Sequence, residues 1–290
     1  MTPLQSLIAA ELAEPVDPRV TAIAVAVAAQ HGAASRAVLF YGSCLRESQL
    51  DGLMLDFYLI VSDYAAAYLR RWLATANRMI PPNVFPFAHE GLAAKYAVLS
   101  EEDFAALNRP DASTVSVWAR FAQPVRLVWC ADQNARDAAV ASVAEAPITL
   151  ALLAAPMTDS NDSTAIWRTG FGLTYTCELR AERTNRSGSI IDADPDRYAR
   201  VSAALPDFTH KMSRADAEQR WGQLRHKGKL LTVARLAKAS LTFAGGIDYL
   251  AWKINRHAGT QIEVKPWQRK WPLLGAVFLV PKLFRQGAIR

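Results

Sequence analysis

The chain has 290 residues, 51% of them apolar, and its 33 Lys and Arg outnumber 27 Asp and Glu, which gives a net charge of +6. A chain of this size and apolar content can form two domains with a sizeable core. Its three cysteines have no CxxC spacing, which excludes a disulfide framework and favours a reducing compartment. The five histidines lack metal-ligand spacing, so the sequence gives no sign of a zinc site.

The first segment, residues 1–35, is predicted to be helical, chiefly in the Ala- and Val-rich stretch Arg19–Gln30. It has no basic start, and Glu11 and Glu14 interrupt its apolar run. Secretory signals need a basic start and transit peptides avoid acids, so we expect no targeting segment here. This favours a bacterial protein acting on the cytoplasmic side.

The next elements carry the most informative motif. Two apolar strands are predicted over 37–41 and 54–61, separated by a turn at Gly42-Ser43. Gly42 permits a turn that brings the main chain close to a phosphate, and Ser43 adds a hydroxyl and an amide at an expected helix start. Asp56, near the start of the second strand, offers an oxygen ligand for Mg²⁺. This arrangement is typical of the core of a nucleotidyltransferase site.

The motif leaves alternatives open. Polymerase-like sites usually carry Asp-x-Asp, and the earlier position here is Met54. Asp51 is out of register with an alternating strand and is interpreted as a turn residue. Cys44 has no base nearby in the sequence, which favours a structural or helix-start role. A hairpin turn followed by an Asp at a strand end also fits the pattern.

The elements up to residue 132 alternate between helix and strand. A helix is predicted over 65–78, a loop after Pro81-Pro82, and a strand over 95–99. Ser100, followed by Glu101-Glu102-Asp103, has the features of a helix N-cap. A last strand is predicted over 125–129. Residues 1–132 are therefore predicted to be a nucleotidyltransferase-like domain of the α+β class, with flanking helices on a mixed sheet.

Residues 133–225 are predicted to form a mostly helical second domain, with a winged-helix arrangement as one option. Its helices are expected over 134–145, 149–154, 164–182, 196–205 and 213–225, with a loop over 184–194. Residues 226–290 are predicted to be a basic C-terminal helical region, with one helix over 229–256 that breaks at Gly245-Gly246.

The C-terminal region also favours an interfacial membrane segment. Residues 211–290 hold 16 Lys and Arg but only 4 Asp and Glu. Within them, the apolar run 272–280 lies between basic clusters, with Trp267 and Trp271 before it. It is too short to span a bilayer. A helix docked on the core is the alternative. Basic charge alone also suits nucleic acid, but no nucleic-acid-binding module is recognisable, so none is expected as a partner.

These motifs together resemble those of the family of the mitochondrial translocator assembly and maintenance protein. Members of that family are CTP:phosphatidate cytidylyltransferases, that is, soluble-type CDP-diacylglycerol synthases. Short matches extend over about 40–285 in a matching order: Tyr41-Gly42-Ser43, Met54-Leu55-Asp56, 83–86, Lys95–Ser100, Arg120–Leu127, Tyr175–Arg180 and 234–246. Their order is more specific than any single match. The resemblance implies CTP and phosphatidate as substrates, Mg²⁺ as cofactor, and CDP-diacylglycerol and pyrophosphate as products.

The chain also departs from the family pattern. Glu178 replaces the Asp of a Tyr-x-x-Asp-x-Arg motif, the loop between Ser43 and Asp56 is shorter, and the acidic residue before Lys-Tyr is absent. The second metal-binding carboxylate is therefore left to Glu178 or Glu90.

The resemblance implies a set of site residues. Asp56 and Ser43 are predicted to be catalytic, and Asp56 and Glu178 to bind the metal. The phosphates are predicted to contact Gly42, Ser43, Arg46, Lys95 and Arg180. The expected location is peripheral, on the cytoplasmic face of a bacterial inner membrane, where the C-terminal region meets anionic lipid. A nucleotidyltransferase with another acceptor and a non-catalytic membrane scaffold are the alternatives.

Overall fold

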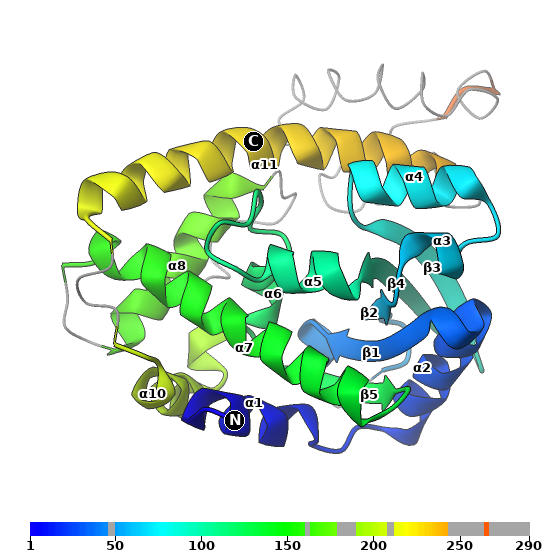
Figure 1. Ribbon diagram of the computed structural model, residues 1–290, viewed down its shortest axis with the longest axis horizontal. Helices are drawn as coiled ribbons and strands as arrows, with labels where there is room; N and C mark the ends of the chain where they lie inside the picture. Colours follow the sequence, from blue (N-terminus) through cyan, green and yellow to red (C-terminus); the bar gives the residue numbers. More distant parts are fainter. Residues whose placement is uncertain (46–49, 160–162, 179–189, 208–211, 243–263, 267–290) are drawn as a thin grey trace.

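The computed structural model describes residues 1–45, 50–159, 163–178, 190–207, 212–242 and 264–266. Its centre is one five-stranded mixed sheet with the order β3-β4-β2-β1-β5, and helices cover both faces (Figure 1). The strands are β1 (Ser35–Tyr41), β2 (Met54–Val61), β3 (Asn83–His89), β4 (Leu92–Ser100) and β5 (Val125–Cys130). β2 and β4 are parallel, and the other neighbours are antiparallel. The predicted α+β class is confirmed.

One face of the sheet is covered by α2 (Pro18–His31), α3 (Tyr64–Ala67) and α4 (Arg71–Met79). Alternate strand residues point to this face, among them Phe57 and Leu59 of β2. The N-terminal segment predicted as helical is divided between α1 (Pro3–Leu12) and α2, each capped by a polar residue followed by proline.

The opposite face packs against a larger helical layer. Its members are α1, α5 (Glu101–Leu107), α6 (Trp118–Phe121), α7 (Gln133–Ala154), α8 (Ser163–Cys177), α10 (Pro195–Ala204) and α11 (Arg214–Thr242). These helices share one hydrophobic cluster with the sheet, and Tyr58 and Ile60 are its β2 members. The proposed boundaries at 132 and 225 stay predictions. This cluster has members on both sides of residue 132, and residue 225 lies inside α11.

Proline explains two differences from the predicted elements. β3 was predicted as a loop, yet it pairs with β4 across seven residues. Its Pro86 is tolerated because β3 is an edge strand. The predicted helices 134–145 and 149–154 are one helix, α7, which continues through the buried Pro147. Packing of α7 against neighbouring helices outweighs the hydrogen bond that proline removes.

The helix expected over 65–78 is divided at Tyr68, whose extended backbone separates α3 from α4. The Tyr68 hydroxyl accepts a hydrogen bond from buried Asn77, 3.1 Å away, which holds this residue inward. Ser100 caps α5 as predicted, because its hydroxyl accepts a hydrogen bond from the amide of Asp103.

The break expected between residues 225 and 229 is absent, since α11 is continuous and runs along the long axis of the molecule (Figure 1). Gly228 lies where α11 crosses the end of α8. A Cβ there would lie 2.2 Å from the carbonyl oxygen of Cys177. Glycine therefore serves close packing of two helices at this point. The expected break at Gly245-Gly246 and the segment 272–280 lie outside the described residues.

Among the described residues, the stretch Gln133–Met157 is the one helical segment long and apolar enough to cross a bilayer. Of its most apolar window, 67% is buried inside the protein. α7 therefore serves as a core helix in this fold.

Candidate functional site

The sheet places three residues of the candidate site side by side in one row across neighbouring strands. Tyr41 of β1, Asp56 of β2 and Lys95 of β4 are register partners. All three point to the face covered by α6 and α11, because their alternate neighbours belong to the core of the other face. The alignment of Asp56 with Lys95 follows from the parallel pairing of β2 with β4, which the sequence did not reveal.

Asp56 lies between a turn and a cation. Its Oδ1 atom is 2.9 Å from the Lys95 ammonium, with the two side chains 23% and 27% exposed. Oδ1 is buried and accepts no hydrogen bond of good geometry from the described residues, so this ion pair is a charge contact with poor angular alignment. Oδ2 faces Gly42, where a Cβ would lie 3.3 Å from it. A carboxylate oxygen held in this way suits a divalent cation.

Gly42 has a positive φ of 100°, which side chains rarely tolerate. The turn continues into a short 3₁₀ segment, Ser43–Leu45, in which Ser43 is exposed and Cys44 is buried. The thiol of Cys44 donates a hydrogen bond to the carbonyl of Met54, which supports the structural role predicted for it. The strand-turn-strand arrangement around Gly42 and Ser43 is therefore present as predicted.

Arg120 adds a second cation beside this row. Its guanidinium lies 3.6 Å from the carboxylate of Glu178, which is 9% exposed, and donates a hydrogen bond to the carbonyl of Ser116. Burial acts to lower the pKa of Arg120, but the charge of Glu178, with smaller effects of Tyr58, Tyr41 and Asp56, raises it overall. Arg120 thus connects Glu178 electrostatically with Asp56.

Aromatic rings form the floor of the site. Tyr41 and Tyr58 lie 5.2 Å apart between ring centroids, and Phe121 packs against both. Burial, followed by the charge of Asp56, raises the pKa of Tyr41 well above its ordinary value. This apolar floor strengthens the charge interactions above it, because it displaces water.

Helix α11 contributes two more basic side chains. Arg235 donates hydrogen bonds of 2.8 Å to the carbonyl of Pro81 and to the hydroxyl of Ser116. Lys238 donates to the carbonyls of Ile80 and Pro82. Burial lowers the pKa of Arg235, while Tyr58 and Glu178 partly offset this effect. α11 therefore fixes the loop 80–82, and Arg235 adds a further cation on this side of the site.

The pKa of Lys238 predicts a pH-dependent stability. Burial, followed by the charge of Arg235, lowers it from 10.5 to about 7. Between these values the unfolded chain binds a proton that the folded protein lacks, so the free energy of unfolding should rise with pH, by up to about 1.4 kcal/mol per pH unit. Urea unfolding at pH of about 7.5 and about 8.5 measures this rise in the free energy of unfolding. At higher pH Cys177 has the opposite effect on stability, because burial raises the pKa of its thiol.

In Lys238→Met the rise in the free energy of unfolding between the two pH values should disappear. Lys229→Met, at an exposed position of the same helix, should keep it. An equal rise in both variants would contradict the assignment to Lys238.

The remaining predicted residues are placed as follows. Glu178 contacts Arg120, and its metal role stays a prediction. Glu90 is exposed in the tight turn between β3 and β4, about four residues along from the Asp56 row, or about 13 Å by strand rise.

Asp51 lies in a turn as predicted and pairs with Arg19 at 3.3 Å. Arg46 and Arg180 lie outside the described residues. No group of three or more His, Cys, Asp or Glu suited to a metal occurs within the described ranges.

Sequence reasoning did not single out Arg120, Arg235 or Lys238. All three belong to segments in which the sequence resembles the cytidylyltransferase family, so those matches were the available signal. A list of motif residues could not show that these segments converge on the row of Tyr41, Asp56 and Lys95.

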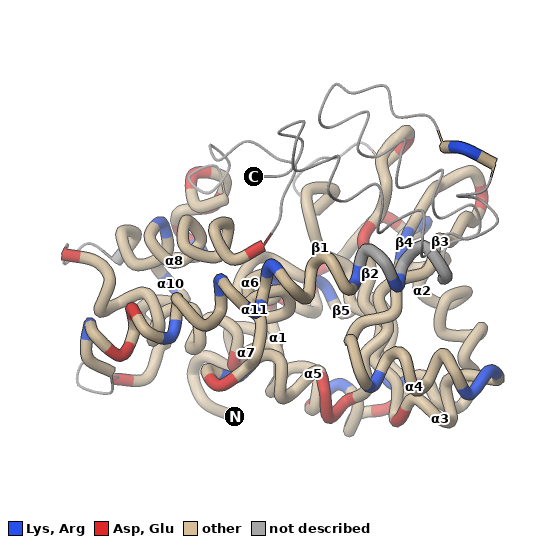
Figure 2. The backbone as a smooth tube through the Cα atoms, turned by 90° about the horizontal axis from the view of Figure 1, so that it is seen from above, with Lys and Arg blue, Asp and Glu red and all other residues tan. Residues whose placement is uncertain are grey.

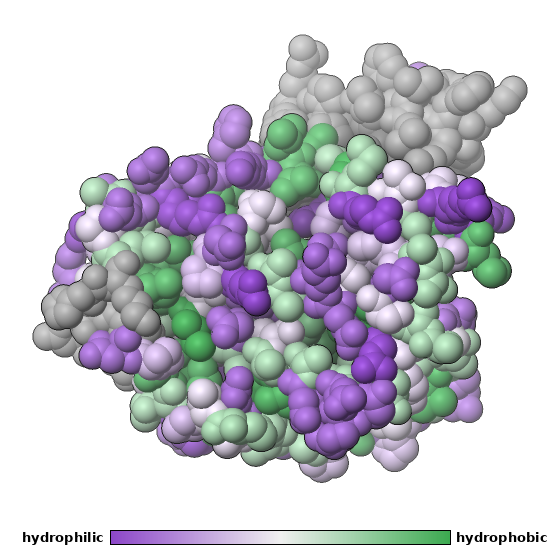
Figure 3. Space-filling view, viewed as in Figure 1, coloured by the Kyte–Doolittle hydropathy of each residue, from purple (hydrophilic) through white to green (hydrophobic). Residues whose placement is uncertain are grey.

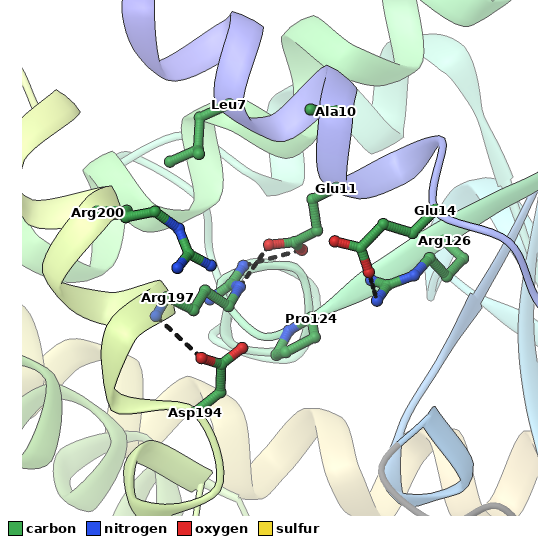
Figure 4. A pocket seen from close by; sticks show the side chains of 9 residues that line it. All are labelled: Leu7, Ala10, Glu11, Glu14, Pro124, Arg126, Asp194, Arg197 and Arg200. Carbon is green, nitrogen blue, oxygen red and sulfur yellow. Dashed lines mark hydrogen bonds and ion pairs between the residues drawn. The ribbon is translucent and has the colours of Figure 1, made fainter.

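A separate cavity of about 240 Å³ lies between α1, β5 and α10 (Figure 4). Glu11 pairs there with the buried Arg197, and Glu14 pairs with Arg126. The cavity contains none of the predicted site residues, and its acids neutralise its arginines. Its geometry points to an ion-pair network that ties α1 to α10.

No protein-family model matches the sequence, and no curated protein matches it. A crystal structure of a nucleotidyltransferase-like protein from Exiguobacterium sibiricum is similar over 93% of both chains, with 11% identity and a TM-score of 0.30. A similarity this weak does not bear on the chemistry of the site.

Proposed function

We propose that this protein is a Mg²⁺-dependent nucleotidyltransferase that acts at the row of Tyr41, Asp56 and Lys95. The observation that carries the proposal is the position of Asp56, between the glycine turn at Gly42 and the ammonium of Lys95. A carboxylate, a close main-chain approach and a cation are the groups that a bound triphosphate with its metal requires.

The chain's own residues have distinct roles in this proposal. Main-chain amides at Gly42 and Ser43 and the Ser43 hydroxyl hold phosphate oxygens. Lys95 and Arg120 neutralise the charge that develops on the phosphates, and Arg235 orients the loop beside them. Because these groups are fixed by the sheet and by α11 before substrate binds, they cost little reorganisation during the reaction.

The residues fit a magnesium ion in part. Asp56 provides one oxygen whose present partner is poorly aligned, and Mg²⁺ is commonly held by one or two carboxylates together with substrate phosphates. Glu178 is the proposed second carboxylate, since its side chain is only 9% exposed and lies next to Arg120. When bound, the ion would neutralise phosphate charge and orient the α-phosphate for in-line attack.

We further propose CTP as the nucleotide and phosphatidate as the acceptor, on the strength of the sequence resemblance. The phosphate of phosphatidate is an anion at neutral pH, so its attack on the α-phosphorus needs no strong general base. One P–O bond forms, the bond to the leaving pyrophosphate breaks, and CDP-diacylglycerol results. The basic C-terminal region would hold the protein at the cytoplasmic face of a bacterial inner membrane.

Pyrophosphate release tests the proposal. Purified protein is mixed with Mg²⁺, CTP and phosphatidate in mixed micelles, and each component is omitted in turn. Release that requires both CTP and phosphatidate is expected. Release with another nucleotide, or without phosphatidate, would support a nucleotidyltransferase that uses a different acceptor. No release by folded protein under any combination would favour a non-catalytic scaffold.

A further inference from the structure

The bend before α4 and the outer face of α4 expose an unusual group of apolar side chains. Six large apolar residues are exposed in the described part of the chain, and three of them, Leu69, Trp72 and Met79, lie within eleven residues. Their exposed fractions are 105%, 43% and 73%. Single exposed apolar residues are ordinary, but a cluster of this kind marks an interaction surface.

The helix explains why these side chains face outward together. Trp72 and Met79 are seven residues apart, which places them on one side of α4, two turns from each other. The buried residues of the same helix, Ala74 and Asn77, face the sheet. Asn77 donates a hydrogen bond of 2.9 Å to the carbonyl of Val98, so the orientation of α4 is fixed.

Basic residues accompany this apolar surface. Arg70, Arg71 and Arg78 are all exposed, and no Asp or Glu occurs between Asp63 and Glu90. Figure 2 shows the basic positions at α4, and Figure 3 shows hydrophobic and strongly hydrophilic side chains side by side at that end of the molecule. Aromatic and aliphatic groups bordered by arginine are the features of a helix that lies in the headgroup region of an anionic bilayer.

We propose that Leu69, Trp72 and Met79 form a membrane-docking face that inserts into an anionic bilayer while Arg70, Arg71 and Arg78 contact lipid headgroups. This face is made of other residues than the basic C-terminal region, and membrane binding through it does not depend on which nucleotide or acceptor the site uses. It adjoins the site through the loop 80–82, whose carbonyls accept hydrogen bonds from Arg235 and Lys238. Docking through α4 would therefore bring the bilayer close to that loop.

The first test is sedimentation of the full chain with vesicles of phosphatidylcholine, alone or mixed with phosphatidylglycerol. Neither lipid is phosphatidate, so binding through a phosphatidate site does not contribute, and failure here is separable from failure of the proposed activity. We expect binding to the mixed vesicles that falls with added salt. In Trp72→Gln/Met79→Gln the partition coefficient should drop about tenfold or more.

Two further variants sharpen the result. Arg71→Gln/Arg78→Gln should lower the partition coefficient on mixed vesicles by about tenfold and weaken its salt dependence. Val25→Gln, at an exposed apolar position of α2, should bind like the wild type. No binding of the wild type to mixed vesicles, or equal binding of all variants, would overturn the proposal and leave any membrane contact to other parts of the chain.

A direct readout uses Leu69→Cys in a Cys130→Ser background, since the other two cysteines are buried. A polarity-sensitive dye on this cysteine should shift to the blue when mixed vesicles are added. Vesicle binding without a shift would show that the face stays in water, which contradicts insertion.

Discussion

Replacing Asp56 with asparagine is expected to reduce nucleotidyl transfer by at least about a hundredfold in kcat, because a neutral amide does not compensate a metal ion or polarise the site. Asparagine keeps the size of the side chain beside Gly42, so the sheet should still form. Pyrophosphate release measures the loss, and far-ultraviolet circular dichroism verifies that the fold is retained.

The matched control is Asp51→Asn. Asp51 lies in the same connection between β1 and β2, its side chain is 73% exposed, and its ion-pair partner in the described structure is Arg19. Its charge should contribute little, since exposed pairs are weak. Near-normal turnover in Asp56→Asn would remove Asp56 from the catalytic machinery, and equal losses in both variants would point to a general effect of charge.

Removing the carboxylate of Glu11 is expected to destabilise the protein by about 3–5 kcal/mol, the usual cost of breaking a buried ion pair by removing one partner. Arg197 is only 3% exposed, and two of its guanidinium nitrogens contact the Glu11 carboxylate. Burial acts to lower the pKa of Arg197, but the charge of Glu11 outweighs it and raises the pKa. Because arginine keeps its proton in proteins, Glu11→Ala leaves a buried guanidinium without this carboxylate partner. Urea unfolding of Glu11→Ala measures the loss.

Glu14→Ala is the control for this change. Glu14 pairs with Arg126 from a position near the end of α1, and its side chain is 53% exposed. The loss should be about 1 kcal/mol or less. A double variant, Glu11→Leu/Arg197→Met, should recover much of the stability because it leaves no charge buried. Similar losses in Glu11→Ala and Glu14→Ala would show that the network at α10 is not buried in solution.

The sequence was informative where local chemistry decides the structure. β2 over 54–61 matches its predicted limits because this run is apolar except for Asp56 and is therefore buried along most of its length. The Ser100 cap and the turn at Gly42 were also predictable, since each depends on one residue and its neighbours. Asp56 could therefore be proposed as a site residue before its surroundings were known.

Features that depend on distant partners could not be predicted. Pro86 suggested a loop because nothing local indicates that its strand lies at the edge of the sheet. Separate helices were predicted on either side of Pro147 and of Gly228, but packing of α7 and α11 outweighs the intrinsic preferences of these two residues. Arg120 and Arg235 join the site only through tertiary contacts, so their place in it required the structure.

The clamp that α11 places on the loop 80–82 has a consequence for the order of folding. Its hydrogen bonds join residues 154 to 158 positions apart in the chain. Contacts of such separation can form only after the whole intervening segment has been brought back to the sheet. During synthesis the residues of the row, Tyr41, Asp56 and Lys95, emerge well before Arg235 and Lys238, so the wall that α11 contributes is the last described part of the site to be made. If the site binds a triphosphate as proposed, that binding is complete only once α11 has been made and has paired with the loop.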